Sequence, residues 1–183
     1  MFIINHNYVA HKVYEMTKDK LNFQWNPGNL FKNIRPDLYG TSHGYDILTH
    51  TGKLPALVTG MYNFATIAIM NGQDPSHHIQ YMIHYITDSM TIGQIVPKNY
   101  GKKDDIYDFL GEFVIPKLTR IPLSYAVISY DAAFAGYLET MVYMYNLYHS
   151  LNYKNFIDYT RESLRLSIQI SSIFLCTLDK GIK

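Results

Sequence analysis

Apolar residues recur at helical spacing along most of the chain. Near its start, Val9, Val13 and Met16 fall at positions i, i+4 and i+7, which places them on one face of a helix. We expect this first helix over residues 5–20, with Asn5 as its N-cap. Similar apolar patterns predict further helices over 54–72, 74–90, 104–118, 124–150 and 153–179. Together they predict an all-α domain of roughly six or seven helices.

Helix breakers and capping residues set the predicted boundaries. The Asn-Gly pair at 71–72 is expected to end the second helix, and Asp74 followed by Pro75 is typical of a helix start. Residues 21–49 carry Pro and Gly breakers and are expected to be loop-rich. The run LRLSIQIS at 164–171 alternates with period two, so a strand stays open there, although its surroundings favour a helix.

Length and composition narrow the class of protein. The chain has 183 residues, 48% of them hydrophobic, which suits one domain spanning 1–183 with a sizeable core. Its formal net charge of +1 indicates neither a nucleic-acid-binding face nor a membrane-binding one. The single cysteine, Cys176, excludes an internal disulfide. We see neither a signal peptide nor an apolar run of about 20 residues, so we expect a cytoplasmic protein without a transmembrane segment.

The segment IHYITDSM (83–90) contains a His and an Asp within an apolar run. His84 and Asp88 stand four residues apart, so they share one face of the predicted helix. Two interpretations are open. The pair is a buried structural hydrogen bond, or both side chains bind one Zn²⁺ ion, whose usual ligands include His nitrogen and Asp oxygen.

Further His and carboxylate residues favour the metal interpretation. His6 lies on the first predicted helix, and Asp37 and His43 lie in the loop PDLYGTSHGYD (36–46). Loops held by a rigid scaffold commonly carry function, whereas this loop has no evident packing role. The remaining candidate ligands lie further along the chain and are Gln94, Asp108 and Glu112.

Other candidates have plainer interpretations. We expect His11 to contact a metal ligand, not the metal itself, or to lie at the surface. His77 is expected to be exposed to solvent near a helix start. Asp46 is expected to cap a turn or to orient His43. Trp25 is expected to pack in the hydrophobic core.

Four stretches combine these residues at a distinctive spacing: NHNYVAHKVYEM (5–16), RPDLYGTSHGYD (35–46), HYITDSMTIGQ (84–94) and YDFLGEFV (107–114). They resemble motifs of the superfamily of bacterial zinc-dependent phospholipase C and fungal single-strand nucleases. The third matches the family's His-x-x-x-Asp motif, which normally ends in a further His. The fourth is a fainter likeness to a His-x-x-x-Glu pair. The resemblance implies an all-helical phospholipase C/nuclease-like domain with zinc ions along a cleft.

The resemblance also implies three sets of zinc ligands, which are Asp37, His43, His84 and Asp88 for the first, Asp88 and His6 for the second, and Glu112 for the third. Gln94 and Asp108 stand where the family has His residues. Glutamine is a poor zinc ligand beside imidazole. We therefore expect one to three Zn²⁺ ions, with two favoured.

These expectations lead to a reaction. Zinc ions would activate a water and neutralise charge on phosphate oxygens during phosphodiester hydrolysis, with Asp37 as the candidate base. The substrate is a phospholipid or a nucleic acid, and no protein partner is indicated. Two alternatives stay open. One is the same fold with a catalytically degenerate site that binds a metal or a partner, and the other is a structural helical protein whose His and Asp residues form buried pairs.

Overall fold

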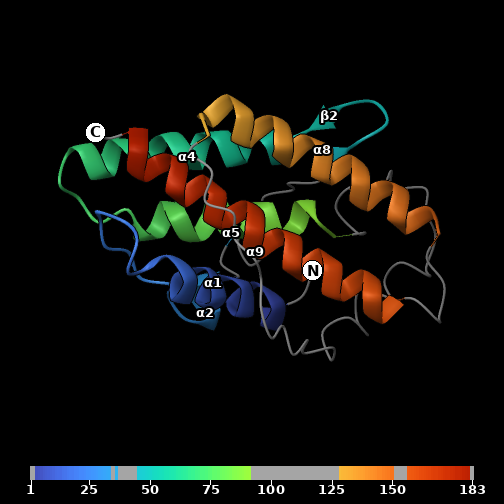
Figure 1. Ribbon diagram of the computed structural model, residues 1–183, viewed down its shortest axis with the longest axis horizontal. Helices are drawn as coiled ribbons and strands as arrows, with labels where there is room; N and C mark the ends of the chain where they lie inside the picture. The colour runs from blue at the N-terminus through green and yellow to red at the C-terminus, as the bar shows by residue number, and fades with distance from the viewer. Residues whose placement is uncertain (1–2, 34–35, 37–44, 92–127, 151–155, 182–183) are drawn as a thin grey trace.

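The computed structural model describes residues 3–33, 36, 45–91, 128–150 and 156–181 (Figure 1). Its helices and strands are α1 (Ile3–Thr17), α2 (Leu30–Asn33), β1 (Tyr45–Asp46), β2 (Thr51–Gly52), α4 (Leu54–Met70), α5 (Ser76–Ser89), α8 (Tyr130–His149) and α9 (Phe156–Gly181). Of the described residues, 76% are helical, and the two strands form a hairpin of only two residues each. The expected all-α character is confirmed for this part of the chain. Among these helices none is both long and apolar enough to span a bilayer.

Helix α5 occupies the centre of the bundle. It packs against α4, α9, α1 and α2, and Figure 1 shows it running between α4 and the pair of α1 and α2. From Ile79 to Met90 every side chain except that of Tyr81 is buried. Polar side chains on this helix are therefore enclosed in the core, where they need partners.

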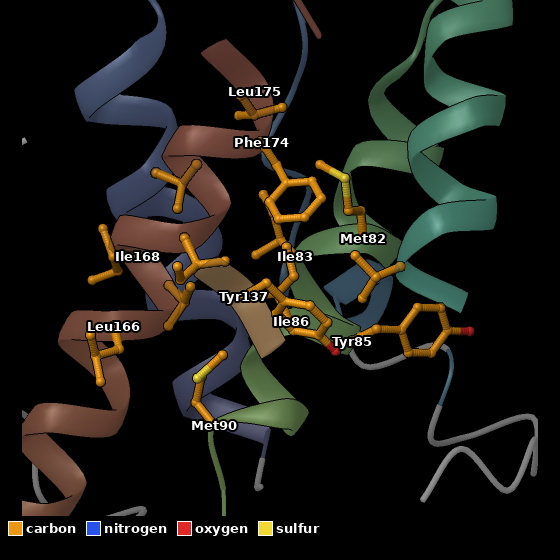
Figure 2. Close-up of a cluster of buried hydrophobic side chains, with 14 of the residues drawn as sticks. Met82, Ile83, Tyr85, Ile86, Met90, Tyr137, Leu166, Ile168, Phe174 and Leu175 are labelled. Atoms are coloured by element: carbon orange, nitrogen blue, oxygen red, sulfur yellow. The ribbon is translucent and has the colours of Figure 1, made fainter. Parts of the chain in front are cut away.

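The hydrophobic core joins α5 to α8 and α9. Met82, Ile83 and Ile86 of α5 face Tyr137 of α8 and Phe174 of α9 (Figure 2), and all five are buried. The Tyr137 ring meets that of Phe174 edge-on, with centroids 6.1 Å apart. The Tyr137 hydroxyl lies 2.6 Å from Oγ of Ser89, so the one polar atom of this ring is satisfied.

Helix α9 includes the run at 164–171 whose alternation left a strand open, and the whole run is helical. The apolar residues Leu164, Leu166, Ile168 and Ile170 are all buried. A helix usually buries one stripe, but α9 contacts α1, α4, α5 and α8. The less buried positions 162, 165, 169, 173 and 176 still recur at helical spacing. The buried side includes the small polar residues Ser167 and Ser171, and these produce the misleading alternation.

Helix boundaries follow the predictions in part. Helix α4 ends at Met70, and Gly72 has a φ of 66° in the following turn, as the Asn-Gly pair predicted. The prediction of Asn5 as an N-cap is wrong, because α1 begins at Ile3 and Asn5 lies inside it. Two isoleucines before Asn5 extend the apolar helix by a further half turn.

The starts of α5 and α8 also differ slightly from those expected. Helix α5 begins at Ser76 with Pro75 in the N-cap position, and Oδ1 of Asp74 accepts a hydrogen bond from the Ser76 amide at 2.9 Å. Helix α8 begins at Tyr130, where Oγ of Ser129 caps the first turn. The helix predicted over 104–118 lies outside the described residues.

The loop at 21–29 is fixed by side chains from two helices. The amide of Asn26 donates to Oγ of Ser76 at 2.7 Å, and Nε2 of Gln80 donates to the Asn26 carbonyl at 2.7 Å. At the loop's start, Nδ2 of Asn22 donates to Oδ2 of Asp179 at 2.7 Å. Within the loop Trp25 is buried, which agrees with its expected packing role.

Candidate metal centre

His84 and Asp88 lie on the inner face of α5. Because they are four residues apart on one helix, their side chains project in the same direction. The distance from His84 Nε2 to Asp88 Oδ2 is 3.1 Å, and each side chain is only 1% exposed. The buried His–Asp pair predicted from the sequence is therefore present.

His6 reaches the same carboxylate from α1. Its Nε2 lies 3.2 Å from Oδ1 of Asp88, so the two oxygens of Asp88 each face a different imidazole. The rings of His6 and His84 are stacked, with centroids 4.0 Å apart and planes inclined by 21°. Potential ligand atoms of the three residues all lie within 4.8 Å of one another. Packing of α1 against α5 thus joins residues 78 or more positions apart in the sequence.

Asn33, the last residue of α2, orients the His84 ring. Its backbone carbonyl oxygen lies 2.8 Å from Nδ1 of His84. A carbonyl can only accept, so Nδ1 must carry the hydrogen, and Nε2 of the neutral ring is left with a lone pair. Sequence reasoning missed Asn33, because every residue type has a backbone carbonyl and no side-chain signal could point to this one.

The hydrogen-bonding roles around Asp88 favour a cation or a proton between the side chains. In the neutral His84 ring the Nε2 lone pair faces a carboxylate oxygen, and two acceptors at 3.1 Å repel each other. A shared proton or a bound metal ion removes that repulsion. The shared proton corresponds to the buried hydrogen bond, and the metal ion corresponds to the Zn²⁺ site, which are the two interpretations that the sequence left open.

Burial keeps His6 neutral. The pKa of His6 is lowered to about 4, chiefly by desolvation and also by the nearby His84, while Asp88 opposes the shift. At neutral pH the His6 ring is therefore uncharged and retains a nitrogen lone pair. An uncharged imidazole is the form that binds a metal ion.

The three side chains fit the requirements of zinc. Two imidazole nitrogens and a carboxylate oxygen form a common zinc donor set. Ligands about 2.0–2.1 Å from a tetrahedral ion lie about 3.3 Å from each other. His84 Nε2 and Asp88 Oδ2 at 3.1 Å have the spacing of two ligands of one ion, and so do His6 Nε2 and Asp88 Oδ1 at 3.2 Å. The carbonyl on His84 Nδ1 is the kind of outer partner that metal-binding histidines have.

The other predicted ligands, Asp37, His43, Gln94, Asp108 and Glu112, lie outside the described residues, so their roles stay predictions. Of the remaining candidates, His11 and His77 are exposed, in agreement with a surface position. Oδ1 of Asp46 accepts from the Leu48 amide at 2.9 Å and so caps the hairpin turn, one of its two expected roles.

A hollow of about 740 Å³ lies elsewhere on the molecule. The loop at 21–29 and the turn between α4 and α5 form its walls. None of His6, His84 and Asp88 lines it. It opens near Ser76, about 12 Å along α5 from His84 at the helical rise of 1.5 Å per residue. This hollow is therefore separate from the candidate metal centre.

Comparison of the chain with protein-family models, with curated proteins and with solved structures gives no match.

Proposed function

We propose that the protein is a zinc-dependent phosphodiester hydrolase whose metal centre includes His6, His84 and Asp88. The observation that carries this proposal is the division of the Asp88 carboxylate, which directs one oxygen to each histidine. A carboxylate arranged in this way can bridge two ions, one held by each ring. The same division is what the motif resemblance implies for Asp88.

Each described residue has a definite part in this proposal. Asp88 supplies the negative charge that attracts and joins the cations. His84 binds through Nε2, since the Asn33 carbonyl occupies its Nδ1 hydrogen. His6 stays uncharged at neutral pH because burial depresses its pKa. Zinc, when bound, supplies Lewis-acid chemistry, because it activates water as a nucleophile and offsets charge on phosphate oxygens.

The remaining ligands are proposed from the sequence. Asp37 follows Asn33 by only four residues, and Gln94 follows Asp88 by six, so both segments leave elements that contact the centre. We propose Asp37 and His43 as ligands of the first ion, with Asp37 also the base that accepts the proton of the attacking water. Gln94, Asp108 and Glu112 are proposed for a third, weaker site.

A structural metal centre is the second candidate function. His6, His84 and Asp88 are each only 1% exposed, and zinc sites closed to solvent are typically structural. In that case the ion would join α1 to α5 without turning over a substrate. This alternative corresponds to a catalytically degenerate form of the same fold.

Metal analysis and a generic phosphodiester substrate distinguish these functions. We expect the purified full chain to contain zinc and to hydrolyse bis-p-nitrophenyl phosphate. His84→Ala and His6→Ala should both lose zinc and activity. The matched controls are His77→Ala and His11→Ala, which remove exposed histidines from the same two helices.

Each result has a definite meaning. Zinc without hydrolysis would favour the structural centre, and a chain that takes up no metal would contradict both functions. If hydrolysis is found, phosphatidylcholine vesicles and single-stranded DNA tested in parallel would identify the class of substrate.

A further inference from the structure

Asn33 is more than a carbonyl beside the metal centre. It is only 2% exposed, and its side-chain Nδ2 donates to Oδ1 of Asn7 at 3.0 Å. Asn7 is the neighbour of His6 on α1. The two asparagines therefore link the helix that carries His6 to the carbonyl that contacts His84.

The position of this carbonyl depends on the side-chain link. The described part of α2, Leu30–Asn33, is one turn, and its place beside α1 depends on tertiary contacts. Its last amide, that of Asn33, donates to the carbonyl of Asn29 at 3.0 Å, which closes a single turn. The hydrogen bond from Asn33 to Asn7 fixes this turn against α1. Without that bond, the turn could shift and move the carbonyl away from the ring.

We propose that Asn33, held by Asn7, is a positioning residue that keeps His84 in the Nδ1–H tautomer and directs Nε2 toward Asp88. A neutral imidazole otherwise exchanges between two tautomers, and only this one presents its lone pair to the centre. The consequence for zinc binding rests on the proposed function, whereas the tautomer does not.

The tautomer can be measured directly in the metal-free full chain. Long-range ¹H–¹⁵N NMR spectra separate the two tautomers of each ring, and a His84→Gln variant assigns the His84 signals. We expect a hydrogen on Nδ1 of His84 in every wild-type molecule, also where a proton is shared between Nε2 and Asp88, and only partial occupancy of this hydrogen in Asn33→Ala and Asn7→Ala. Asn7→Asp retains an oxygen acceptor for Nδ2 and should restore the wild-type pattern. Asn63→Ala, an exposed asparagine on α4, is the control.

Zinc affinity provides the second readout, measured by competition with a chromophoric chelator. Loss of an outer hydrogen bond to a ligating histidine typically weakens metal binding 10–100-fold. We expect that loss for Asn33→Ala and Asn7→Ala, and wild-type affinity for Asn7→Asp and Asn63→Ala. If Asn33→Ala does not fold, Asn7→Ala decides the question by the same two readouts, because Asn7 is only half-buried.

The inference and the proposed function can fail separately. If folded Asn7→Ala and Asn33→Ala keep a hydrogen on His84 Nδ1 in every molecule, the positioning role is wrong. If the wild type shows the expected tautomer pattern but binds no zinc, the positioning role stands and the metal-dependent function is wrong.

Discussion

Asp88 is a carboxylate with almost no exposure to solvent, and the imidazoles of His84 and His6 lie 3.1 and 3.2 Å from its oxygens. Enclosing a charge of this kind is costly unless it is paired. Here the compensation comes from two different helices, so the carboxylate joins α1 to α5. The chemistry of the centre is thus inseparable from the packing of the molecule.

The buried His6 makes the stability of the metal-free protein depend on pH. Its folded-state pKa is about 4, against 6.5 for the free side chain. Between these values the unfolded chain binds a proton that the folded chain does not, so the free energy of unfolding falls as the pH is lowered. The shift corresponds to about 3 kcal/mol in total.

Urea unfolding in a chelator at pH 7, 6, 5 and 4 would measure this loss. The free energy of unfolding should depend less on pH in His6→Gln than in the wild type. In His11→Ala it should depend on pH as strongly as in the wild type. If the free energy of unfolding changes equally with pH in His6→Gln and in the wild type, His6 does not cause the pH dependence.

The residues of the centre differ in how well the sequence could predict them. His84 and Asp88 were predictable because one helix fixes their spacing. The approach of His6 depends on how α1 packs against α5, which no local pattern contains, and only the motif resemblance suggested it. Asn33 was unpredictable, because its contribution to His84 is a backbone atom.

At the scale of the elements, the turn between α4 and α5 has a backbone conformation that favours glycine at position 72. Gly72 has a φ of 66°, and a Cβ added to it would meet no atom of the described residues within 4 Å. The cost of Gly72→Ala is therefore backbone strain alone, about 1–2 kcal/mol. Gly136 in α8 differs, because its backbone is helical, although a Cβ there also meets nothing within 4 Å in the part of the chain that the structure describes.

We expect opposite effects from the same chemical change at these two glycines. Gly72→Ala should lower the melting temperature, and Gly136→Ala should raise it, because alanine stabilises a helix interior by about 0.5–1 kcal/mol relative to glycine. Differential scanning calorimetry of the two variants would check both signs. A stabilising Gly72→Ala would show that the left-handed conformation is not required.

Helices α4 and α9 show what the apolar pattern could and could not predict. Helix α4 has a partly exposed face and clear stop residues, and its predicted end is within two residues of the observed one. The end of α9 was predicted equally well, but Ser167 and Ser171 on its buried side make the run at 164–171 alternate like a strand. The element types were accessible from the pattern, whereas exact starts depended on capping geometry that only the structure supplies.

At the scale of the whole molecule, the proposed ion would act as a cross-link. The candidate ligands come from α1 and α5, and α2 supports one of them. Binding to the folded chain alone stabilises it by about 4 kcal/mol when zinc is at 1,000 times its dissociation constant. We expect removal of zinc by EDTA to lower the melting temperature by several degrees and added zinc to restore it.

The variant His84→Ala provides the comparison for this effect. It should melt at the same temperature with and without EDTA, whereas His77→Ala should respond like the wild type. If neither EDTA nor added zinc changes the melting temperature of the wild type, the proposal that a zinc ion cross-links the helices is wrong.

The packing of α9 against α1 has a consequence for synthesis. Asp179, near the end of α9, holds Asn22 just after α1. On the ribosome, α1 therefore emerges long before the helix that covers it. The apolar sides of α1 and α5 stay open to solvent, or to a chaperone, until the residues up to Asp179 have left the exit tunnel.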